Sequence, residues 1–87
     1  MEKDSGLYDR AVNHAAQAAE LSSNAEERLW RRLYWAWYVQ LRDGAPAGIA
    51  ALQQVQQEIA TSGVTNPKLA ENAAKRMQEW QQQIKGP

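Results

Sequence analysis

Residues that could perform acid–base, nucleophilic or metal chemistry are few and scattered in this chain. The 87 residues include no cysteine and one histidine, His14. On a helix, no carboxylate lies three or four positions from His14, so nothing is placed to orient it as a general base. No residues have metal-ligand spacing, and there is no glycine-rich phosphate loop. The sequence therefore predicts a protein that is not an enzyme and that binds neither metal nor cofactor.

Residue types suited to recognition gather in residues 29–41, which hold three of the four tryptophans. On a helix with about 100° per residue, one side of this stretch is a core stripe of Leu29, Trp30, Leu33, Tyr34, Trp37 and Leu41. The opposite side carries Arg28, Arg31, Arg32, Trp35, Tyr38, Val39 and Arg42. Trp, Tyr and Arg are enriched at interface hot spots. We therefore predict that these seven residues form a partner interface.

Two interpretations of this arginine–aromatic side remain open at this point. In the first, Trp35 packs against another helix of the same chain, with arginine stems over its edges. In the second, the side binds a protein partner or a second copy, as in a homodimer. The second interpretation predicts that Trp35→Glu abolishes a complex and leaves helicity intact.

The preferred function is a small adaptor, chaperone-like subunit or inhibitor that binds protein. The alternative is a nucleic-acid-binding protein that uses the same arginines, with Trp35 and Tyr38 as stacking groups. Ten basic and ten acidic residues give zero net charge, which argues against a polyanion binder. The longest apolar run, residues 33–39, is far shorter than the roughly 20 residues of a membrane span, and membrane-surface association is a third, weaker hypothesis.

Alanine and glutamine dominate the composition and phenylalanine is absent, which favours helices. We predict one all-α domain, a small antiparallel bundle of three or four helices at 7–21, 25–42, 46–62 and 67–84. Residues 1–6 and 85–87 are predicted as loose ends. Because the apolar pattern continues in phase through residues 22–24, the first two helices are alternatively one long helix.

Turn and capping signals support the separate helices. Asn24 has capping-box spacing to Glu27, which favours a new helix at residue 25. Gly44 and Gly63 are suited to helix C-termini. Asn66 precedes a proline, as a cap precedes the first residue of a helix.

The helix predicted at 7–21 has an alanine-rich apolar side, which favours close approach of a neighbouring helix. The side comprises Tyr8, Ala11, Val12, Ala15, Ala18 and Ala19. The tryptophan-bearing helix is its natural complement within the chain, and a seam between copies is the other interpretation.

A chain of this size has a thin hydrophobic core, so association is one route to stability. The predicted core comprises Val12, Leu29, Trp30, Leu33, Trp37, Leu41, Ile49, Leu52, Val55, Ile59, Leu69, Met77, Trp80 and Ile84. The first residues lack the apolar segment of a secretory signal, which predicts a cytoplasmic protein. Short chains of this kind are typical of bacterial or phage genomes.

Overall fold

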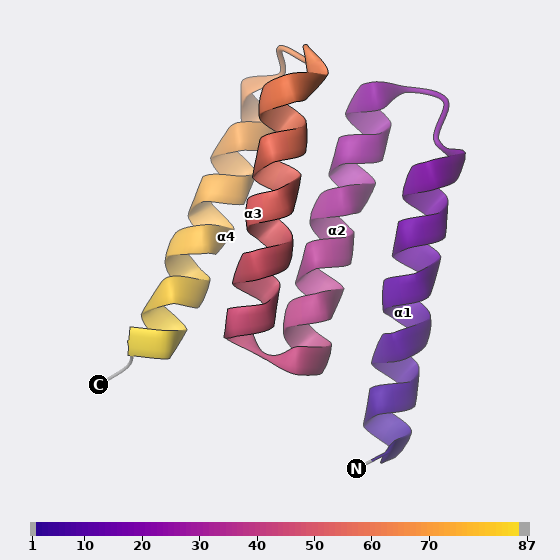
Figure 1. Cartoon of the computed structure of the whole chain (residues 1–87), viewed down its shortest axis with the longest axis vertical. Coiled ribbons are helices and arrows are strands. Elements are labelled where there is room, and N and C mark those ends of the chain that lie inside the picture. The colour runs from indigo at the N-terminus through magenta and orange to yellow at the C-terminus, as the bar shows by residue number, and fades with distance from the viewer. Residues whose placement is uncertain (1, 86–87) are drawn as a thin grey trace.

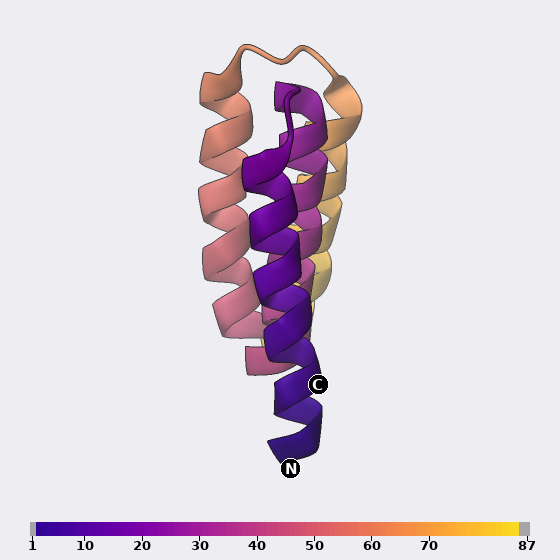
Figure 2. The same ribbon diagram turned by 90° about the vertical axis from the view of Figure 1, so that its right-hand side faces the viewer.

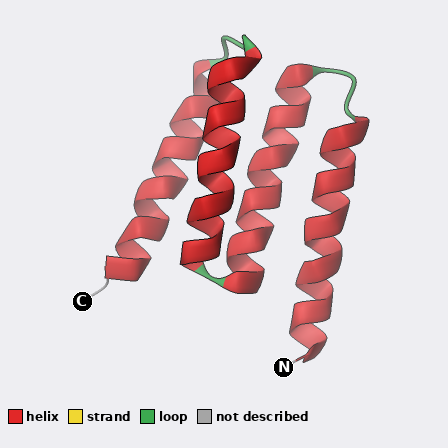
Figure 3. Cartoon of the chain, in the orientation of Figure 1, coloured by secondary structure: helices red, strands yellow, loops and turns green. Residues whose placement is uncertain are grey.

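The chain folds into four helices, as the sequence predicts. A computed structural model describes residues 2–85, with side chains described from residue 6 onwards. The helices are α1 (Glu2–Leu21), α2 (Ala25–Asp43), α3 (Ala45–Ser62) and α4 (Pro67–Lys85) (Figure 1). Figure 3 shows helices joined by short loops, with no strand in the described part. Within residues 2–85, no helix is both long and apolar enough to cross a membrane.

The break between α1 and α2 lies at residues 22–24, so the alternative of one long helix is wrong. The Ser22 hydroxyl donates to the carbonyl of Ala18 over 2.8 Å, which satisfies one terminal acceptor of α1. Asn24 has extended backbone angles, and its side-chain oxygen accepts from the amide of Glu27 over 3.0 Å. This N-cap starts a new helix, and the chain reverses.

The other two reversals use the predicted glycine and asparagine signals. Gly44 alone separates α2 from α3, with a φ of 98° that side-chain-bearing residues rarely adopt. Gly63 ends α3 in the left-handed region with a φ of 78°. The Asn66 side chain then accepts from the amide of Lys68 over 3.0 Å, at the start of α4.

The chain ends differ from the predicted loose segments. Helix α1 begins at Glu2, so residues 2–6 are helical where the sequence predicts an irregular lead-in. Lys85 is the last residue of α4, whereas residues 1 and 86–87 lie outside the described part.

Helix α2 is the centre of the molecule. It packs against α1 on one side and against α3 on another, and α4 covers the seam between α2 and α3. Between residues 2 and 85, α1 packs closely against α2 and against neither α3 nor α4. Figure 2 shows α1 in front of α2, with α3 and α4 apart on either side. The bundle is therefore open beside α1.

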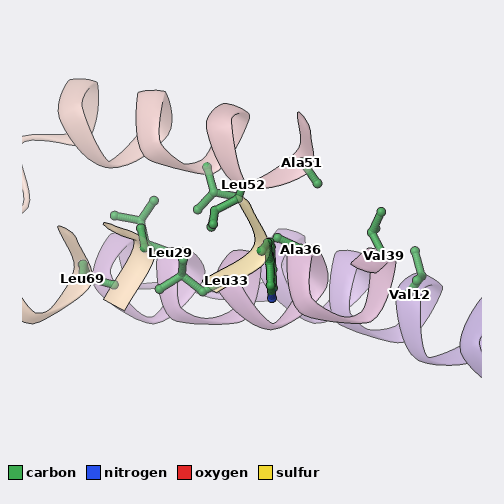
Figure 4. Close-up of a cluster of buried hydrophobic side chains, with 11 residues drawn as sticks. Val12, Leu29, Leu33, Ala36, Val39, Ala51, Leu52 and Leu69 are labelled. Carbon is green, nitrogen blue, oxygen red and sulfur yellow. The ribbon is translucent and has the colours of Figure 1, made fainter. Parts of the chain in front are cut away.

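The core runs along α2 and includes most of the predicted residues (Figure 4). Its buried members are Val12, Leu29, Leu33, Ala36, Val39, Ala51, Leu52, Val55, Leu69, Ala73 and Trp80. Two predicted core residues, Leu41 and Ile84, are instead 39% and 53% exposed, so their assignment is wrong. Both lie in the last turn of a helix.

Helices α2 and α3 approach so closely that only glycine fits at their contact. A Cβ atom at Gly48 would lie 2.4 Å from Cβ of Gln40. Gly48 therefore brings the two backbones together and fixes which side of α2 faces α3.

Candidate binding surface: two grooves beside α1

Helix α1 docks in antiparallel register on the very side of α2 that carries the predicted interface. Near one end, Arg42 donates to the Asp9 carboxylate over 2.8 Å. One turn further along, Val12 and Val39 are both buried in the core cluster, where they lie near one another (Figure 4). At the other end, Arg28 donates to the carbonyl of Ser22 over 3.3 Å.

Trp35 lies midway between the two residues of α2 that mark the ends of this contact. Arg28, Trp35 and Arg42 are spaced seven residues apart, so they share one side of α2; Arg42 binds α1, and Arg28 binds Ser22 just after α1 ends. Trp35 is partly buried and packs on the core. Ala19 is fully buried, as close packing of this helix within the chain predicts. Trp35 therefore packs within its own chain with Arg32 over its ring, as the first interpretation predicts, and a partner role for this side stays a prediction.

The first groove, here called the charged groove, lies between α1, α2 and α3. It has a volume of about 420 Å³ and is lined by Ala16, Ala19, Glu20, Arg28, Arg32 and Glu58. Arg32 donates through two nitrogens to the two carboxylate oxygens of Glu58, over 3.0 and 2.8 Å. The same guanidinium lies 4.0 Å from the centre of the Trp35 ring. A forked pair combined with a cation–π contact holds Arg32 in one orientation.

The second groove, here called the tyrosine groove, lies on the other flank of α1. It has a volume of about 440 Å³ and is lined by Ala11, His14, Ala15, Ala18, Arg31, Tyr34 and Tyr38. Tyr34 is 52% exposed although the sequence places it in the core stripe, so that assignment is wrong. A smaller notch of about 50 Å³ on the far side of Tyr34 is lined by Trp30, Leu33, Asn72 and Arg76. Tyr34 is thus a ridge between two hollows.

Two stripes of regularly spaced residues border the tyrosine groove. On α1 the stripe is Leu7, Ala11, His14, Ala18 and Leu21, with steps of four and three residues. On α2 it is Arg31, Tyr34, Tyr38 and Leu41, with the same steps. Alternating steps of three and four are the pattern of a helix seam that packs on another helix. Leu7 and Leu21 are 64% and 84% exposed, so no helix of the described chain covers the α1 stripe at its ends.

The structure divides the seven predicted interface residues instead of keeping them on one surface. Arg28 and Arg32 line the charged groove. Arg31 and Tyr38 line the tyrosine groove. Val39 is 8% exposed and lies in the core, so it is not at the surface of the folded chain. The exposed members of the predicted interface therefore belong to two separate surfaces. That the seven residues bind a partner together remains a prediction.

Arg42 closes the end of the α1–α2 contact. It binds Asp9 across the two helices and its neighbour Asp43, each at 2.8 Å. Hydrogen bonds to Asp43, and then to Asp9, raise the pKa of its guanidinium above the ordinary value. Arg42 therefore keeps its positive charge at any ordinary pH.

The sequence contains the signal for the tyrosine groove, but the signal is ambiguous before the helix partners are known. A wheel of α2 places Tyr34 beside Leu33 and Trp37, as in any core stripe. Only the position of α1 shows that Tyr34 and Leu41 lie on the part of the α2 surface that other helices leave exposed.

The arrangement offers recognition chemistry, namely phenol hydroxyls, an imidazole and a guanidinium over an apolar floor. Within the described residues, no three His, Asp or Glu side chains lie close enough together to hold a metal ion. Comparison with protein-family models, curated proteins and solved structures found no match to this chain.

Proposed function

We propose that this protein is a non-enzymatic protein–protein interaction module, such as a small adaptor, chaperone-like subunit or inhibitor. It binds through the tyrosine groove and the two stripes that border it. The observation that carries the proposal is the half-exposed Tyr34, which stands between two hollows on the uncovered side of α2. Tyrosine and arginine beside concave apolar surface are the residue types that dominate interface energetics.

The state of the arginines supports protein rather than nucleic acid as the partner. Arg31 pairs with Glu27 at 2.6 Å, and Arg32 pairs with Glu58 at 2.8 Å. Arg42 pairs with Asp9 and Asp43. A phosphate backbone would have to displace these carboxylates, which removes much of the gain from releasing counterions. The aromatic groove and neutral net charge fit a protein partner better.

A photo-crosslinking amino acid tests the proposal at single-residue resolution. Benzoylphenylalanine replaces Tyr34 in the full chain, and the matched control carries it at Gln54, on the exposed side of α3. Both versions are irradiated in cells and the adducts are identified by mass spectrometry. We expect a discrete protein adduct, with another protein or with the chain itself, from position 34 and none from position 54.

The opposite result is equally clear. If position 34 gives no adduct while circular dichroism shows an unchanged fold, the tyrosine groove is not a binding surface. Equal adducts from both positions would indicate collision rather than binding, and would likewise count against the proposal.

A further inference from the structure

We infer that the occupant of the tyrosine groove is a second copy of this chain, docked by a two-fold axis parallel to the helices. This inference rests on the proposed function and names its partner. In such a dimer, α1 of each copy lies antiparallel on α2 of the other. The two α1–α2 hairpins form a four-helix bundle in which every neighbouring pair is antiparallel.

The α1 stripe of one copy is complementary in shape to the α2 stripe of the other. Neither stripe is complementary to a second copy of itself. On α1 the stripe is low at Ala11 and Ala18, which lie on either side of His14, whereas α2 is high in its middle at Tyr34 and Tyr38. If α2 met α2, tyrosines would oppose tyrosines; if α1 met α1, the alanines would leave a void. Placing α1 on α2 of the second copy seats tyrosine ridges in alanine hollows, as efficient packing requires.

Charge also permits this face to meet its own copy. All nine stripe residues are described, and Arg31 is the one Lys, Arg, Asp or Glu among them. Glu27 neutralises Arg31 within the same helix at 2.6 Å. Two copies therefore approach without net repulsion, and the zero net charge of the whole chain adds no barrier.

The size of the face is sufficient for a stable dimer. Helices of 20 and 19 residues are about 30 Å long, and a pair of them is about 20 Å wide, or roughly 600 Å² in projection. The accessible area of a ridged face exceeds its projection, which brings it near the about 800 Å² per partner of standard interfaces. Helix α3 contacts α2 through Gly48 and Gln40, and α4 borders the face where Asn72 and Arg76 lie beside Tyr34, whose side chain is still half exposed.

Mass in solution tests the inference first. We expect light scattering of the wild type to rise with concentration from the 9.8 kDa monomer to twice that mass. Tyr34→Glu should raise the dissociation constant at least 100-fold, and Leu21→Glu should weaken the dimer similarly. Leu21 is highly exposed, so Leu21→Glu should leave the fold intact. It therefore still tests the dimer if Tyr34→Glu unfolds the chain. Gln54→Glu adds the same charge on the exposed side of α3 and should dimerise like the wild type.

Cysteine pairs test the orientation, because the chain has no cysteine of its own. In the proposed register Ala11 of one copy lies near Leu41 of the other. A mixture of Ala11→Cys and Leu41→Cys chains should therefore form a disulfide-linked heterodimer faster than either chain alone forms a homodimer. Faster linkage of Ala11→Cys to itself would place α1 on α1 and overturn the arrangement.

Failure of this inference is distinguishable from failure of the proposed function. A wild type that stays monomeric at every concentration overturns the second copy as occupant. The same holds if Tyr34→Glu and Leu21→Glu both dimerise like the wild type. A photo-adduct with a different protein at position 34 would then retain the interaction module, whereas the absence of any adduct there would remove both.

Discussion

The two grooves beside α1 have nearly equal volumes, yet they differ in how their polar groups are satisfied. In the charged groove, Arg32 makes a fork to Glu58 and lies on Trp35, so its donors and its flat face are occupied within the chain. In the tyrosine groove, Tyr34 and Tyr38 present ring surface, and no side-chain hydrogen bond of either tyrosine is found among the described residues. The polar groups of Arg32 in the first groove are thus satisfied within the chain, whereas the tyrosines of the second groove are not hydrogen-bonded through their side chains in the described part.

The difference shows that residue type alone does not identify a binding surface. Trp35 and Arg32 belong to the types most enriched at interfaces, but they stabilise the contact between helices of one chain. Tyr34 is equally typical of a core and lies half exposed. The position of α1 accounts for the difference between Tyr34 and the other two residues. Helix α1 covers one side of α2 and leaves the adjacent side, which carries Tyr34, exposed.

The largest effect is expected from changing the fit of α1 itself. Ala19 is 1% exposed against α2, so Ala19→Leu should force α1 outward and reduce the free energy of unfolding by about 1–3 kcal/mol. Both grooves should lose their shape together. Urea denaturation followed by circular dichroism measures the loss, and Ala74→Leu on the exposed side of α4 is the matched control. Equal stability of Ala19→Leu and the wild type would show that α1 is not tightly docked.

A smaller effect is expected from breaking the fork in the charged groove. Glu58→Gln removes the charged partner of Arg32, whose side chain is only 17% exposed, and should cost about 1–2 kcal/mol of stability. Self-association should be unchanged, because the pair lies on the other flank of α1. Thermal unfolding and light scattering measure the two properties, with Glu79→Gln as the exposed control on α4. A loss of association without a loss of stability would assign binding to the charged groove.

The smallest effect is expected at the end of the α1–α2 contact. Arg42→Gln removes ion pairs with Asp9 and Asp43, whose side chains are 55% and 43% exposed, so less than about 1 kcal/mol should be lost. The difference from wild type should shrink as salt screens the pairs. Urea denaturation at low and high salt checks this, with Lys75→Gln on α4 as the control. A large loss that salt does not change would mean that Arg42 acts through packing.

Local rules were enough to predict the four helices and their turns. Asn24, Gly44 and Gly63 act through the backbone of a few neighbouring residues, so their roles can be read along the chain. The approach of α3 to α2 at Gly48 could not be predicted, because it depends on a contact with Gln40 in another helix.

The candidate site was only partly predictable for the same reason. A helical wheel separates two sides of α2, but three helices surround it and the wheel does not say where each docks. Arg31 and Tyr38 were placed at a surface that the structure retains, whereas Val39 was placed there and is buried. The alanine side of α1 indicated close packing without indicating which side of α2 would receive it.

Two neighbouring residues provide the most direct test, because Tyr34 lines the tyrosine groove whereas Trp35 packs on the core beneath Arg32. The measurement is the solution mass and the thermal midpoint of Tyr34→Glu and Trp35→Glu at the same concentrations. We predict that Tyr34→Glu unfolds near the midpoint of the dissociated wild type and remains monomeric, whereas Trp35→Glu loses stability because a charge replaces a ring that packs on the core. The contradictory result is a stable, monomeric Trp35→Glu beside a Tyr34→Glu that dimerises like the wild type, which would return the binding surface to the arginine–aromatic side.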